Sequence, residues 1–277
     1  MILEMVSSYN KIINTRGGIM SKKIDRTGEE RVNNFGSKMI IKEYRNKRDV
    51  DVYFPEYDWT FEHTQYTHFK RGSIKCPYEP RYYDHGYLGE GKYKMSENGK
   101  NTDKYVIWYN MLKRCYDSKY HEKEPTYKGC IVEEFLLNFQ HMAEWIENNY
   151  YEVPGEKMCL DKDILCKGNK IYSRETCIFV PSRINTLFIK CNKSRGKDPI
   201  GVTELPSGNY RVFCNDGYGE QIRLGTYSTK EEAFRVYKEY KEKLIKDTID
   251  SYEGKIPEPH YSRLKIAMYN YKVEITD

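Results

Sequence analysis

The sequence contains no long hydrophobic run. No window approaches the about 18 consecutive apolar residues of a membrane-spanning helix, so we expect no membrane partner. The apolar part of residues 1–21 is too short for the core of a secretory signal peptide, which predicts a cytoplasmic protein. A further methionine, Met20, lies at the end of this stretch. We therefore interpret residues 1–32 as an N-terminal extension outside the fold.

The sequence also lacks paired cysteines. None of its eight cysteines belongs to a Cys-x-x-Cys pair, which excludes zinc fingers and zinc ribbons. Without a secretory signal we expect reduced thiols that act as small apolar residues. Histidine is scarce as well. His63, His68 and His85 are too scattered to predict a metal site, and no histidine lies between His141 and His260.

The composition excludes disorder and the coating of a polyanion. Disordered chains have few aromatic residues, whereas 14% of these 277 residues are aromatic and 27 are Tyr. The formal net charge of +5 is too small for a histone-type protein. The positive charge is concentrated in residues 161–197, where nine basic residues accompany three acidic ones. Such a stretch is either a solvated surface or a phosphate-binding face.

The chain length favours more than one domain, and we expect an α+β multidomain protein. Residues 37–54 contain two apolar runs around a polar turn, and a second hairpin-like stretch follows at residues 59–69. These patterns predict a small β-barrel accessory domain over residues 33–91.

Residues 92–197 form the second predicted domain. Apolar residues at three- and four-residue spacing predict helices at residues 103–117 and 132–149. Beyond them the sequence predicts short strands, followed by a short helix that opens at Pro181-Ser182 and carries Asn185. The expected strands are residues 158–160, 171–172 and 177–180.

Residues 198–277 form the third predicted domain. Three candidate strands are separated by the turn sequences Pro206-Ser207-Gly208 and Asn215-Asp216-Gly217. Thr229 then begins a helix, with Glu232 three residues on as in a capping box. We therefore predict a three-stranded antiparallel sheet plus one helix, with strands at residues 200–204, 209–214 and 220–227.

The third domain resembles the DNA-binding domain of the plant Apetala/ethylene-response-factor family, which also occurs in phage and mobile-element proteins. The resemblance covers about 50 residues. It is carried by Gly201-Val202, Gly208-x-Tyr210-Arg211, Leu224-Gly225-Thr226-Tyr227 and Glu231-Glu232-Ala233-Phe234. It implies that the sheet enters the major groove of DNA, with Arg211, Gln221 and Arg223 contacting bases. An ordinary solvated sheet face is the alternative.

The second domain resembles the divergent HNH-type region that accompanies such domains in phage homing-endonuclease-like proteins. The resemblance covers about 85 residues. Its motifs are Trp108-x-x-Met111-x-x-Arg114-Cys115-Tyr116, Tyr127-x-Gly129, Phe135, Phe139, Trp145, Leu160-Asp161-Lys162-Asp163, Tyr172-Ser173-x-x-x-Cys177 and Val180-Pro181-x-x-Ile184-Asn185. The resemblance implies a ββα-metal nuclease in a bacterial host, with one divalent ion and a general-base histidine. This sequence has no such histidine, so Asp161 or Asp163 would have to serve.

These motifs give a set of candidate site residues. Asp161 and Asp163 are the candidate catalytic carboxylates, and Lys162 between them is the candidate phosphate contact. Asp161, Asp163 and Asn185 are the candidate ligands for Mg²⁺ or Mn²⁺. Each has a structural alternative, either a turn with an ion pair or a helix cap. The candidate nucleic-acid contacts of the middle segment are Arg114, Lys167, Lys170, Arg174 and Arg183.

Three functions remain open. The first is a phage-type DNA-binding protein whose HNH-like region cleaves DNA by metal-assisted hydrolysis. The second is a catalytically inactive nucleic-acid or nucleoprotein binder, such as a phage regulator or an inhibitor of a host defence complex of the anti-CRISPR kind. The third is an interaction protein whose many tyrosines contact protein partners.

Overall fold

The computed structural model describes residues 24–189 and 197–275. The described residues divide into two compact units: the first ends at Cys76 and the second begins at Pro77. Residues 77–91, which we had grouped with the accessory domain, thus belong to the second unit. Residues 1–23 of the predicted N-terminal extension lie outside the described residues. The prediction is wrong for residues 30–32, which form a strand paired with residues 38–40 and so belong to the fold.

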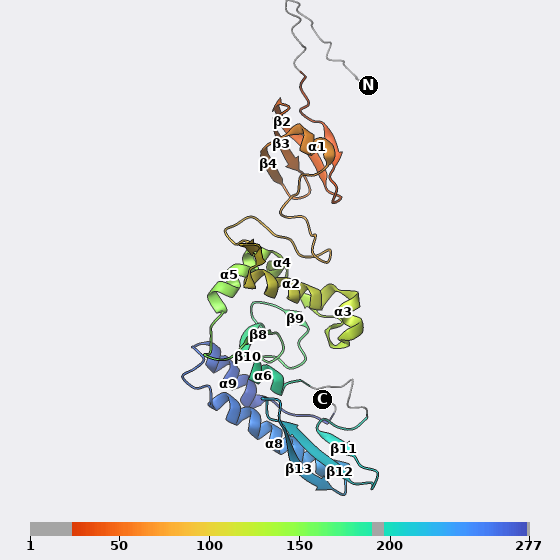
Figure 1. Cartoon of the computed structure of the whole chain (residues 1–277), viewed down its shortest axis with the longest axis vertical. Coiled ribbons are helices and arrows are strands. Elements are labelled where there is room, and N and C mark those ends of the chain that lie inside the picture. The colour runs from red at the N-terminus through yellow and green to blue at the C-terminus, as the bar shows by residue number, and fades with distance from the viewer. Residues whose placement is uncertain (1–23, 190–196, 276–277) are drawn as a thin grey trace, which may run out of the picture. The chain divides into compact units, whose positions relative to one another are not determined.

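The first unit is an open antiparallel sheet in the order β1-β2-β3-β4, with a short helix after it (Figure 1). The elements are β1 (Glu30–Val32), β2 (Lys38–Asn46), β3 (Asp49–Phe54), β4 (Trp59–Thr64) and α1 (Tyr66–Arg71). The predicted β-barrel is therefore wrong. The described strands form an open sheet. The edge strand β1 pairs with β2, the other edge strand β4 pairs with β3, and no pairing joins β1 to β4 among the described residues. The second predicted hairpin is one strand that leads into α1.

Strand alternation in the first unit points the apolar side chains to one face. Met39, Ile41, Val50, Val52 and Phe54 are buried there, and α1 adds two buried aromatic residues to the core. Gly72 ends α1 in the left-handed region, at φ +68°, which glycine adopts without steric cost.

The second unit contains two packed helices, α2 (Asp103–Tyr116) and α5 (Phe139–Asn149). The first lies close to the predicted residues 103–117. The helix predicted at residues 132–149 is shorter than expected, because the extended backbone of Asn138 makes Phe139 its first residue. The side chain of Thr102 caps the first helix and that of Asn138 caps the second. Trp108 is fully buried between them and donates its indole N–H to the carbonyl of Leu136. Short elements surround this pair: β5 (Ser96–Glu97), β6 (Lys100–Asn101), α3 (Ser118–Lys123), η1 (Pro125–Tyr127), β7 (Ile131–Val132) and α4 (Glu134–Leu137).

A β-hairpin with a helix follows. Strands β8 (Met158–Asp161) and β10 (Ile178–Pro181) pair antiparallel, and α6 (Ser182–Leu187) starts directly after β10 and packs on both strands. Between them, β9 (Ile171–Tyr172) pairs with β7 in parallel. The strands and the short helix lie where the sequence predicts them.

The predicted C-terminal sheet is confirmed. Its strands are β11 (Val202–Glu204), β12 (Tyr210–Asn215) and β13 (Gln221–Tyr227), in that order and antiparallel. Helix α8 (Lys230–Asp250) covers one face of the sheet (Figure 1), and Thr229 caps it by accepting from the N–H of Glu232. A further helix, α9 (His260–Asn270), was not predicted.

Helix α8 belongs to two hydrophobic cores. Its first half, with Ala233 and Tyr237, packs on the sheet beside Val212 and Cys214. Its second half, with Ile245 and Ile249, packs with α9, α6 and β10. The second core therefore crosses the boundary we had drawn at residue 197.

All seven cysteines that the structure describes are free, and five of them are buried. Within the described chain, no helix has both the length and the apolar character that would let it cross a membrane.

Candidate nucleic-acid interface and carboxylate pair

The solvent face of the C-terminal sheet carries the three predicted base contacts. Val212 and Cys214 of β12 point into the core, so the side chains that alternate with them point outward. Cross-strand pairing joins Arg211 to Thr226, Phe213 to Arg223 and Asn215 to Gln221. Because directly paired residues share a face, Arg211, Gln221 and Arg223 lie on one surface.

Cationic, aromatic and amide groups alternate on this surface. The guanidinium of Arg211 lies 5.2 Å from the ring centroid of Phe213, and that of Arg223 donates to the hydroxyl of Thr226 at 3.3 Å. Nε of Arg211 is buried and, among the described residues, has no hydrogen-bond partner. The side chains of Gln221 and Arg223 are exposed, so this face has N–H donors that a ligand can reach.

The predicted carboxylates lie at the end of β8. Asp161 pairs with Ile178 as the last residue of the strand, and its Oδ1 accepts from the N–H groups of Asp163 and Ile164, at 2.9 and 2.7 Å. Its second oxygen is not needed for this turn. Asp163 is more exposed, and its carboxylate lies 3.2 Å from the ammonium of Lys162.

The two carboxylates repel each other. Burial, together with the charge of Asp163, raises the pKa of Asp161 to about 6, against the two N–H donors that lower it. A divalent ion bound between these oxygens would remove that repulsion, and carboxylate oxygens are the donors that Mg²⁺ and Mn²⁺ favour. The donor set therefore fits the ion that the HNH resemblance implies.

Lys162 holds the loop after β8. It is 6% exposed, and its ammonium donates to the carbonyl of Asn169 at 2.8 Å. The side chain of Asn169 in turn donates to the carbonyls of Lys162 and Ile171. These mutual hydrogen bonds between Lys162 and Asn169 hold the two ends of loop 162–169 together. A phosphate contact by Lys162 would therefore require the loop to open. No local pattern in the sequence indicates that Lys162 and Asn169 pair in this way.

Asn185 lies in α6, which packs against β8 and β10. Among the described residues, no hydrogen bond joins its side chain to Asp161 or Asp163.

Tyr127 is a neighbour of the two carboxylates. Burial raises its pKa, Arg114 lowers it, and both Asp161 and Asp163 raise it further. Because Tyr127 lies far from Asp161 and Asp163 in the sequence, the sequence did not predict that they interact.

The predicted cations of the middle segment contact the protein itself. Arg114 lies 5.7 Å from the ring centroid of Tyr127, and Lys170 donates to the carbonyl of Thr126. Arg174 makes a two-pronged ion pair with Glu133. Lys167 donates to the carbonyl of Lys272, and Arg183 covers the ring of Tyr218 at 4.1 Å. Their contact with phosphate stays a prediction; residues 190–196 of the basic stretch lie outside the described residues.

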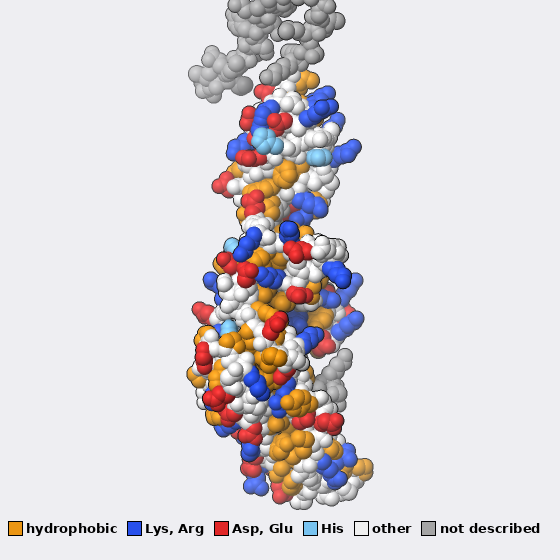
Figure 2. All heavy atoms as spheres, turned by 60° about the vertical axis from the view of Figure 1, so that its left-hand side comes forward, with side chains coloured by type: hydrophobic (Ala, Val, Ile, Leu, Met, Phe, Trp, Pro, Cys, Tyr) orange, Lys and Arg blue, Asp and Glu red, His pale blue; other side chains and the backbone are white. Residues whose placement is uncertain are grey.

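No family model, no curated protein and no solved structure matches this chain. On the face drawn in Figure 2, Lys and Arg side chains are interspersed with Asp and Glu side chains. The cations on this face do not form a broad basic patch, so a polyanion could contact only small local groups of them.

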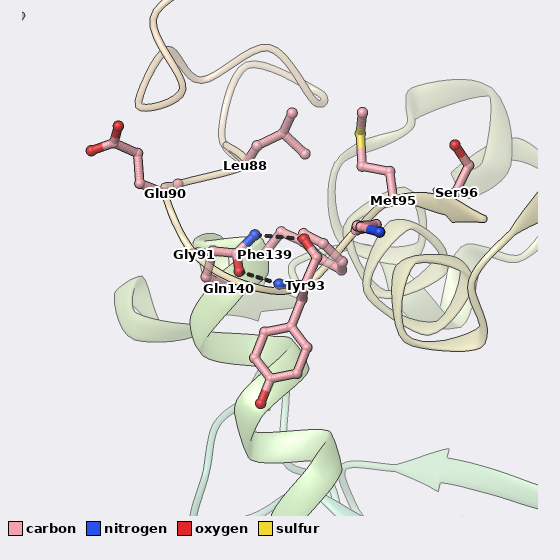
Figure 3. A pocket seen from close by; sticks show the side chains of 10 residues that line it. Leu88, Glu90, Gly91, Tyr93, Met95, Ser96, Phe139 and Gln140 are labelled. Atoms are coloured by element: carbon pink, nitrogen blue, oxygen red, sulfur yellow. Dashed lines mark hydrogen bonds between the residues drawn. The ribbon is translucent and has the colours of Figure 1, made fainter.

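A groove of about 580 Å³ lies between residues 88–96 and the start of α5 (Figure 3). Gln140 fixes its floor, because its side-chain amide accepts from the N–H of Tyr93 and donates to the carbonyl of Tyr93. A Cβ at Gly91 would lie 2.3 Å from the Gln140 side chain, so only glycine permits this close approach. None of the predicted site residues lines the groove.

Proposed function

We propose that the protein binds double-stranded DNA through the solvent face of the β11-β12-β13 sheet. The observation that carries the proposal is the side-by-side placement of Arg211, Gln221 and Arg223 on one face whose other side is covered by α8. Arg pairs with guanine and Gln with adenine in the major groove, and each good bidentate pair gives about 1–3 kcal/mol of discrimination.

The charge of the strands is unevenly divided between the two faces of the sheet. The strand positions on the solvent face carry two cations and no carboxylate; they are Thr203, Arg211, Phe213, Asn215, Gln221, Arg223 and Thr226. Residues 198–229 as a whole carry four acidic and two basic residues, and α8 carries six of each, so the cationic character is local to this face.

Fluorescence anisotropy with labelled duplexes from a random library tests the proposal. We expect R223A and R211A each to weaken binding about tenfold, the loss of one bidentate contact. The matched control is R235A, which removes the same charge from the exposed side of α8. Binding that R235A weakens as much as R223A, or that neither sheet variant changes, would refute the sheet as the interface.

A second candidate function is metal-dependent hydrolysis of the bound DNA. The specific observation is the adjacent pair Asp161 and Asp163 with the raised pKa of Asp161, at the end of a hairpin followed by α6. These residues would hold the ion, which would polarise the phosphate, while the Asp161 turn would fix the carboxylate orientation. A carboxylate is a weaker base than imidazole at neutral pH, so the expected rate is low.

Plasmid nicking in Mg²⁺ or Mn²⁺ tests this second candidate. We expect wild-type protein to nick, and D163A to be inactive while binding DNA as wild type does. Equal activity of D163A would exclude the carboxylate pair as the site. Binding without any nicking would leave the inactive DNA binder, the alternative function, as the conclusion.

A further inference from the structure

The first unit contains a second cluster of metal-ligating side chains, remote in sequence from the carboxylate pair. Asp49, Asp51 and His63 each offer a ligand atom, and these atoms lie within 4.8 Å of one another. We propose that they form a site for a first-row transition-metal dication of the zinc type. This inference is independent of the DNA-binding proposal.

Irregular pairing of three strands creates the cluster. The register shifts between Ile41 and Glu43 and between Tyr44 and Asn46 where β2 meets β3, and again between Val50 and Val52 where β3 meets β4. At this point the N–H of His63 donates to Oδ1 of Asp51 at 2.9 Å in place of a ladder bond. Nδ1 of His63 lies 3.0 Å from Oδ1 of Asp49. The imidazole thus already faces the carboxylate oxygens.

Arg45 orients both carboxylates from behind. Its guanidinium lies 3.3 Å from Oδ2 of Asp49 and 2.8 Å from Oδ2 of Asp51. The other oxygen of each residue, Oδ1, is the one that faces His63. Partners that hold the far side of a ligand in this way fix its orientation toward a metal.

The charge of the cluster leaves room for a cation. Glu43 is a third carboxylate on the same guanidinium, at 3.5 Å. Three carboxylates and one guanidinium carry two net negative charges. The side chain of Asp51 is 12% exposed and that of His63 is 69% exposed, so an ion can enter from solvent on the histidine side.

The imidazole decides which ion fits. Mg²⁺ and Ca²⁺ favour oxygen ligands, whereas Zn²⁺ binds nitrogen and carboxylate oxygen at about 2.0–2.2 Å. Three protein ligands and a water complete a tetrahedral zinc site.

Isothermal titration with Zn²⁺ on the full chain, treated with a chelator and kept in excess Mg²⁺, tests the proposal. We expect wild-type protein to bind one more equivalent of Zn²⁺ than H63A or D49N. We expect R45Q to keep that equivalent with about tenfold weaker affinity, since it loses the orienting group. The matched control is H68A, which removes an exposed histidine of the same unit.

The variants separate the outcomes. Zn²⁺ binding by H63A, with circular dichroism showing a native fold, at the same stoichiometry and affinity as wild type would overturn the proposal. Loss of the equivalent in H68A, or its displacement by Mg²⁺ at equal concentration, would overturn it as well. R223A is expected to bind Zn²⁺ normally, so failure of the DNA interface and failure of the metal site remain distinguishable.

Discussion

Replacing Asp161 by Asn should stabilise the protein at neutral pH. The amide oxygen can accept the same two N–H groups, from Asp163 and Ile164, while the charge that burial and Asp163 disfavour is removed. A carboxyl whose folded pKa is raised loses stability as pH rises toward that pKa, because the unfolded chain releases its proton first. The gain from D161N therefore grows with pH between about 4 and 6.5.

The magnitude follows from the pKa values. A rise from 3.8 to about 6 costs wild-type protein about 3 kcal/mol at pH 7.5, since one pKa unit corresponds to about 1.4 kcal/mol. At pH 5 the unfolded chain is ionised and the folded carboxyl is mostly protonated, so the cost is roughly half as large. D161N should thus gain more at pH 7.5 than at pH 5, by about 1 kcal/mol.

Urea unfolding of both proteins at pH 5.0, 6.0 and 7.5 measures this difference. The matched control is D117N, because Asp117 likewise accepts from the N–H groups two and three residues on, but at the exposed start of α3. A D161N protein that is less stable than wild type at pH 7.5, or whose gain does not change with pH, would refute the reasoning. The same pH-dependent gain in D117N would assign the effect to capping turns in general.

Three further predictions concern the second unit. W108F should lower the free energy of unfolding by about 2–4 kcal/mol, because it opens a cavity and leaves the carbonyl of Leu136 without its donor, and urea unfolding measures it. N169A should lower it by about 2–3 kcal/mol through loss of the hydrogen bonds that close loop 162–169, with DNA affinity by anisotropy unchanged. K241M should be neutral or stabilising at pH 7, because burial lowers the pKa of Lys241 and disfavours its charged form; calorimetric Tm at pH 7 and 10 should show the advantage shrinking as pH rises.

Local sequence signals predicted the second unit well. Apolar spacing located α2 and the end of α5, and the capping box at Thr229 located the start of α8. Turn sequences located the strands of the C-terminal sheet within two residues. These elements depend on interactions between residues a few positions apart, which a single sequence displays.

The sequence did not predict contacts between residues that lie far apart in the chain. Closure of the first sheet depends on whether its edge strands meet, and strand alternation is the same in an open sheet and a barrel. The hydrogen bonds between Lys162 and Asn169, and the approach of Tyr127 to Asp161, depend on the loop path. In the sequence we compared His63 only with His68 and His85, whereas strand pairing brings it to Asp49 and Asp51.

Sharing α8 between two cores has a consequence for how this part of the chain can evolve and unfold. Ile245 and Ile249 would be exposed if the sheet and its helix were excised alone. Recombination could therefore transfer the sheet to another protein only together with α9 and the β8–β10 hairpin. For the same reason the two cores should be lost together, and amides of β12 and β10 should exchange with deuterium through one common opening.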